Sequence, residues 1–97
     1  MSTPDRLRSL EQLAGFNETQ ASRQLAERLR GLAREEDRLR QLQDYAREYA
    51  GRSPAAGTTV AALQAGRRFL ERLQGAVGQQ LDVVQRARQH VDQATAD

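Results

Sequence analysis

Apolar side chains recur every seven residues along two segments of this chain. The first series is Leu25, Leu32, Leu39 and Ala46, and the second is Leu63, Leu70, Val77, Val84 and Val91. A seven-residue period keeps one face of a helix directed at a neighbouring helix over many turns. The pattern therefore predicts two long helices joined along a hairpin seam made of Leu25, Leu32, Leu39, Ala46, Leu63, Leu70, Val77 and Val84.

Start and stop signals place the two helices. Thr3-Pro4-Asp5 suits a helix N-terminus, because Thr can cap, Pro fits the first turn and Asp complements the dipole. Gly51 stands where a left-handed residue often ends a helix, and Pro54 follows shortly. Either Thr58 or Thr59 can cap the next helix. We expect helix 1 over about 4–50, a turn over 51–58 and helix 2 over about 59–95.

The direction and register of the pairing follow from the same series. Folding the chain at Pro54/Ala55 sets Leu39 against Leu70. The other members of the two series then pair in the same antiparallel register. The expected fold is all-α: a long antiparallel two-helix coiled coil, or helical hairpin, that forms a single domain over 1–97.

The expected register leaves the start of helix 1 unpaired. Asp97 falls opposite Gln12, so residues 1–11 have no counterpart within the chain. Leu7, Leu10 and Leu13 form an apolar stripe in this region. Either another molecule covers the stripe or the native chain continues beyond Asp97. The second explanation is favoured, and the domain is then expected to lack the C-terminal part of its second helix.

Composition supports a narrow seam rather than a globular core. Hydrophobic residues make up 38% and charged residues 29%, with two Tyr, two Phe and no Trp. The absence of Cys fits a reducing cytosol, and no run approaches a membrane span. All fifteen basic residues are Arg, but thirteen acids leave a net charge of +2. A nucleic-acid partner and membrane insertion are therefore not expected.

Candidate chemistry is sparse. His90 is the only histidine and has no Cys or second His to complete a metal site. The acidic run Glu35-Glu36-Asp37 is followed by Arg38 and Arg40, which favours a solvated face of ion pairs over a cation site. No phosphate-binding glycine loop is present. We expect no enzymatic activity, no cofactor and no metal.

Three of the four aromatic residues lie near the turn and share helical faces with apolar neighbours. Leu42, Tyr45 and Tyr49 form one stripe, which begins at Arg38, and Phe69, Leu73 and Ala76 form another, which ends at Gln80. The spacing fits two interpretations. The stripes widen the seam, or they form a docking face, since Tyr and Phe are common interface anchors.

The segment 35–49 resembles the centre of the first helix of the FliJ family of flagellar export stalk proteins. The resemblance rests on the order Glu, Leu, Leu, Tyr, Tyr at Glu36, Leu39, Leu42, Tyr45 and Tyr49, followed by a Gly/Pro-containing turn. It continues in the second helix at Phe69-Leu70-Glu71-Arg72-Leu73 and Gln79-Gln80-Leu81. It covers roughly residues 5–95, and its distinctive part is about 30 residues long.

The resemblance implies a cytoplasmic protein at the inner face of the inner membrane, within the flagellar type III export apparatus. Its implied partners are the export ATPase ring, the membrane export-gate protein and export chaperones. The family's gate-contacting face maps onto Leu42, Tyr45, Tyr49, Phe69, Leu73 and Ala76. Arg38 stands where Gln is usual and Gln80 where His is known, which leaves the ends of that face in doubt. The end carrying Leu7, Leu10 and Leu13 is expected to face the ATPase.

Three other functions remain open. A stalk protein of a virulence-type secretion system shares the architecture. A self-associating structural coiled coil would have no link to an ATPase, and it predicts concentration-dependent dimers. A nucleic-acid binder ranks third and predicts a steep dependence of affinity on salt.

Overall fold

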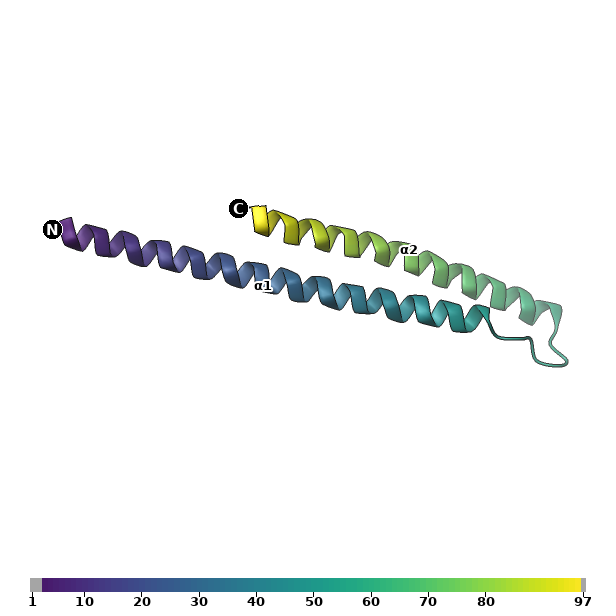
Figure 1. Ribbon diagram of the computed structural model, residues 1–97. Helices are drawn as coiled ribbons and strands as arrows, with labels where there is room; N and C mark the ends of the chain where they lie inside the picture. The colour runs from purple at the N-terminus through teal and green to yellow at the C-terminus, as the bar shows by residue number, and fades with distance from the viewer. Residues whose placement is uncertain (1–2, 97) are drawn as a thin grey trace.

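The computed structural model describes residues 3–96 as two long helices, with no strand in that range. Helix α1 spans Thr3–Ala50 and helix α2 spans Val60–Ala96. The helices run antiparallel side by side, and together they form a rod of 88 × 16 × 16 Å (Figure 1). The predicted helical hairpin is confirmed, and each observed helix boundary lies within about one residue of the predicted one.

The turn between the helices contains the expected threonine cap, but its left-handed residue is not the expected one. Thr59 caps α2, because its Oγ1 accepts a hydrogen bond from the Ala62 N–H at 3.1 Å. Gly51 was expected to be left-handed, and this is wrong: among the described residues, only Gly57 has a positive φ, at 82°. Thr58 N–H donates to the Ala55 carbonyl at 3.1 Å, so Gly57 is the third residue of a β-turn, where type II geometry requires positive φ.

The seam is only partly shielded from solvent, as expected when each helix has one neighbour. Val84 is fully buried, with 2% of its surface exposed, and it alone reaches that level within residues 3–96. Most of the predicted seam is half-buried, namely Leu25, Leu32, Leu39, Ala46, Leu70 and Val77. Leu63 is the exception, because it is 48% exposed and lies outside the packed seam.

Leu63 is exposed because the two helices pair in a different register from the expected one. Gln80 of α2 hydrogen-bonds to Glu35 of α1, whereas the expected register places residue 74 opposite Glu35. At the turn, a Cβ on Gly66 would lie 3.1 Å from the Tyr49 Oη, so Gly66 faces Tyr49 where Val60 was expected. The helices are thus shifted by about one heptad from the predicted register.

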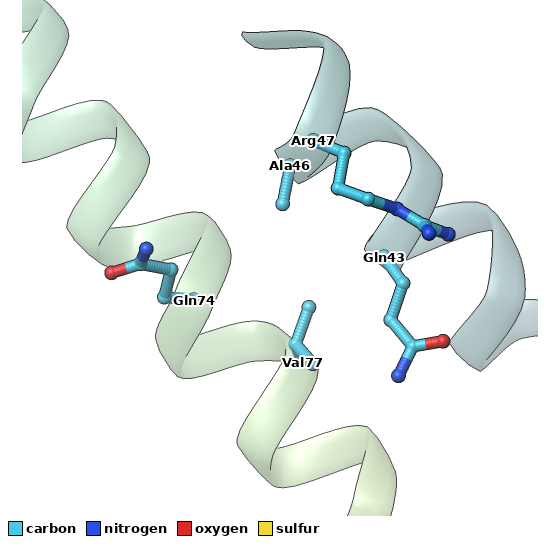
Figure 2. Close-up of a pocket in the computed structure, with 5 residues that line it drawn as sticks. All are labelled: Gln43, Ala46, Arg47, Gln74 and Val77. Carbon is cyan, nitrogen blue, oxygen red and sulfur yellow. The ribbon is translucent and has the colours of Figure 1, made fainter. Parts of the chain in front are cut away.

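A groove on the flank of the seam agrees with the direction of this shift. Gln43, Ala46 and Arg47 of α1 line it together with Gln74 and Val77 of α2 (Figure 2). In the expected register, Ala46 would have faced Leu63 instead. The seven-residue pattern identified the packed faces correctly. It could not identify the register, because sliding one helix along the other by a full repeat brings the same faces together.

The shift changes both ends of the rod. At the turn, the first residues of α2 project beyond the last turn of α1, and the loop 51–59 folds back beside them (Figure 1). At the other end, residues 3–19 of α1 are exposed, and Gln20 is the first half-buried residue. The unpaired part of α1 is therefore longer than predicted. Asp97, which was expected opposite Gln12, lies outside the described residues.

Candidate docking surfaces

Three aromatic rings join the two helices near the turn. The Tyr49 and Phe69 rings meet edge-to-face, with centroids 4.9 Å apart and an interplanar angle of 65°. The Tyr45 ring also lies edge-to-face with Phe69, with centroids 6.2 Å apart and an interplanar angle of 90°. Tyr49 and Phe69 are half-buried, whereas 42% of Tyr45 is exposed. The cluster therefore contributes to packing between helices and also leaves one aromatic side chain accessible.

The stripe residues divide between packing and exposure. Leu42, Leu73 and Ala76 are half-buried, as expected for side chains at the edge of the seam. Arg38, Leu42 and Tyr45 of α1 line one groove with Gln80 of α2, and its volume is about 520 Å³. The structure thus brings the predicted stripes of the two helices together. Tyr49 and Phe69 widen the seam, as one interpretation predicted, and Tyr45 stays exposed. The docking face remains a prediction.

Hydrogen bonds cross the seam at Gln80, which lines this groove. The Gln80 amide donates to the Glu35 carbonyl at 2.9 Å and to its carboxylate at 2.8 Å. Arg38 adds an ion pair to the same carboxylate at 3.0 Å. The Glu35 side chain is 20% exposed, so this carboxylate is partly desolvated and paired. Sequence reasoning treated Glu35 as a solvated residue, and the heptad position of Gln80 was the signal that could have revealed the link.

The opposite end of the rod carries an uncovered apolar surface on α1. Leu7, Leu10 and Leu13 are 55%, 62% and 56% exposed, as the sequence predicted for an unpaired stripe. Phe16 extends the surface and is 58% exposed. Sequence reasoning overlooked Phe16, although its three-residue spacing from Leu13 was visible. We refer to these four residues as the N-terminal apolar surface.

Nothing in the described part of the chain assembles into a metal site or a membrane span. Within residues 3–96, no three His, Asp or Glu side chains gather where they could hold a metal ion. His90 lies exposed beside Arg28, Arg34 and Glu35 at a shallow pocket. Neither α1 nor α2, over those same residues, contains a stretch apolar and long enough to cross a membrane.

A narrow rod of two antiparallel helices with half-buried contacts along its seam defines the class of elongated helical hairpin proteins. Comparison with known families makes the class specific. The sequence model of the family described as "Flagellar FliJ protein" matches residues 2–97, and the chain belongs to this family of flagellar protein export. No curated protein and no solved structure matches the chain.

Proposed function

We propose that this chain is a stalk that links the export ATPase ring to the membrane export gate of the flagellar type III apparatus and handles export chaperones. It does so as a non-enzymatic cytoplasmic protein at the inner face of the inner membrane. The family membership favours this function over the virulence-type stalk. The observation that carries the proposal is the N-terminal apolar surface, which lies at the end of an 88 Å rod remote from the aromatic cluster.

The length of the rod keeps its two ends apart. A two-helix coiled coil holds its ends apart because its seam keeps the helices in register over tens of ångströms. Partners bound at the two ends of such a rod do not overlap. The N-terminal apolar surface would contact the ATPase ring. The face formed by Leu42, Tyr45, Tyr49, Phe69, Leu73 and Ala76 would contact the export gate.

The ATPase contact is tested by measuring turnover of the cognate flagellar export ATPase with and without this chain. We expect stimulation that is lost when Leu7→Asp and Leu10→Asp are combined, because a carboxylate at an apolar contact must be desolvated. Gly15→Asp with Ser22→Asp is the matched control, since it adds the same charge at two exposed positions on the other face of this helical segment. Equal loss in both double variants, or no stimulation by the unaltered chain, would contradict the proposed ATPase contact.

The gate contact is best tested at Tyr45. Phe69 packs against both tyrosines, so Phe69→Ala would disturb the fold as well as any docking face. Tyr45→Ala removes the most exposed ring of the aromatic cluster near the turn, and we expect it to weaken binding of the purified gate protein by roughly tenfold or more. Glu48→Ala, at an exposed site one turn further along, is the control. Unchanged affinity for Tyr45→Ala would remove this residue from the gate surface.

A second candidate function rests on the same uncovered surface. Exposed apolar side chains on a helix also favour self-association, and a structural coiled coil without an ATPase partner would use them in this way. Sedimentation velocity over a range of concentrations separates the two functions. Dimers that disappear in Leu7→Asp/Leu10→Asp, together with no ATPase stimulation, would support the structural coiled coil.

A further inference from the structure

A pocket at the turn end of the rod arises from the observed register. The start of α2 extends beyond α1, and the loop folds back beside it, so three segments border an open hollow of about 440 Å³. This volume is within the range of pockets that bind small ligands or single side chains. The tip pocket, as we call it, is lined by Tyr49, Ala50, Arg52, Ser53, Pro54, Ala55, Thr58, Ala62, Leu63, Gly66, Arg67 and Leu70.

The tip pocket has an apolar wall that is open to solvent. Leu63 and Leu70 contribute aliphatic surface from α2, and Tyr49 contributes its ring from α1. Leu63 is 48% exposed, and the neighbouring Val60 is 70% exposed. An apolar side chain from a partner that entered the pocket would cover Leu63 and would gain roughly 25 cal/mol for each Å² removed from water.

The charged side chains that line the pocket are those of Arg52 and Arg67, which are both cationic. Between Tyr49 and Phe69 the chain contains Arg52, Arg67 and Arg68 and no Asp or Glu, and the nearest acids along the chain are Glu48 and Glu71. Arg52 and Arg67 line the pocket, and neither forms an ion pair within residues 3–96. The Arg52 guanidinium lies 5.6 Å from the centroid of the Tyr49 ring, which holds it at the pocket wall. The free donors of both guanidinium groups suit carboxylates.

From this combination we infer that the tip pocket binds an acidic segment of a partner protein. A large apolar side chain of that segment would enter beside Leu63 and Leu70. Neighbouring Asp or Glu side chains would pair with Arg52 and Arg67. The concave shape favours a peptide over an anionic membrane surface, since a membrane contact would use a convex apolar face and would leave the pocket unfilled.

This inference goes beyond the stalk function and does not depend on it. Of the residues assigned to the export gate, only Tyr49 lines the tip pocket. The test therefore uses the purified full chain without ATPase or gate protein, and its outcome is independent of both. Circular dichroism first establishes that each variant remains helical.

The probe is a library of random peptides displayed on phage and selected against the immobilised chain. We expect enrichment of sequences in which Asp or Glu flank one or two large apolar residues. The best enriched peptide is then synthesised and titrated by fluorescence anisotropy. We expect Arg52→Glu with Arg67→Glu to weaken its binding by roughly tenfold or more, since it turns two attractive contacts into repulsive ones. Leu63→Ser should weaken it similarly, and raising the salt from about 50 to about 200 mM should also do so.

Arg86→Glu with Arg88→Glu is the matched control, because it reverses two exposed charges near the far end of α2. Its affinity for the peptide should equal that of the unaltered chain. Enrichment of neutral or basic peptides, or binding that survives Arg52→Glu/Arg67→Glu, would overturn the inference. Binding to phosphatidylserine vesicles that requires Val60 and Leu63, with no acidic peptide selected, would assign the tip to a membrane surface instead.

Discussion

Burial is concentrated at very few residues in a molecule of this shape. Each helix has a single neighbour, so most seam side chains keep part of their surface in water. Val84 is the exception among the described residues, with 2% of its surface exposed. Because packing energy follows the area removed from water, we expect Val84 to contribute more to stability than any chemically similar residue nearer the ends.

Val84→Ala should lower the free energy of unfolding by about 1–3 kcal/mol, through lost burial and the small cavity that remains. Val60→Ala is the matched control, because the same methyl groups are removed from a side chain that is 70% exposed. It should change stability by less than about 0.5 kcal/mol. Urea unfolding followed by circular dichroism measures both. Equal losses would mean that the tip residue Val60 is covered in solution, or that Val84 is not.

Sequence alone could predict which residues face the partner helix but not how deeply each is buried. Leu63 and Val84 hold equivalent positions in the same seven-residue series, yet one is half exposed and the other is fully buried. The difference depends on what lies opposite, and that is fixed by register. Tyr45 and Tyr49 differ for a related reason, because the Phe69 ring covers Tyr49 more closely than Tyr45.

At the scale of the elements, register is the property that periodicity cannot determine. A slip of one heptad, about 10 Å at 1.5 Å per residue, brings the same faces together. Two side-chain matches favour the observed alignment. Gln80 reaches Glu35, whereas the predicted register would place Gln74 opposite Glu35. Gly66 leaves room for Tyr49, since any Cβ there would lie 3.1 Å from its hydroxyl. Both matches involve particular atoms, which a hydrophobic pattern does not describe.

The role of Gln80 can be tested with introduced cysteines, because the chain has none of its own. Ala46 and Val77 line one groove, so Ala46→Cys should form a disulfide with Val77→Cys and none with Leu63→Cys, its partner in the predicted register, since bridged Cα atoms must lie within about 7 Å. Adding Gln80→Leu removes the polar match, and we expect the Ala46→Cys/Leu63→Cys disulfide to appear as a second population. Polar seam residues commonly fix register in this way, at some cost in stability.

Gln79→Leu is the control for this experiment, because Gln79 is exposed and lies next to Gln80. It adds the same apolar group without touching Glu35, so only the Val77 disulfide should form. If both disulfides form already in the unaltered seam, the hairpin slips freely and Gln80 does not select the register. If Gln80→Leu yields only the Val77 disulfide, the aromatic contacts at the turn suffice to fix it.

At the scale of the whole molecule, the register sets what each end of the rod presents. The shift that projects Val60 and Leu63 at the turn also uncovers residues 3–19 at the other end. The sequence predicted an unpaired N-terminal stripe, but it underestimated the length because it misjudged the register. The fold class, helix boundaries and packed faces were predictable from local signals. The tip pocket was not, since it exists only when α2 extends beyond α1.

The uncovered part of α1 should be the least stable part of the described rod when the protein is alone. An isolated helical segment of this length is marginal in water, because helices in proteins gain most of their stability from packing. Hydrogen exchange should therefore be faster at residues 3–19 than at the paired residues 28–45, by about tenfold or more. Mass spectrometry of pepsin fragments from a dilute sample measures both regions. Similar protection in the two regions would require that something covers the N-terminal apolar surface. If that protection fades on dilution, the covering molecule is a second copy of the chain, which would favour the structural coiled coil over the stalk.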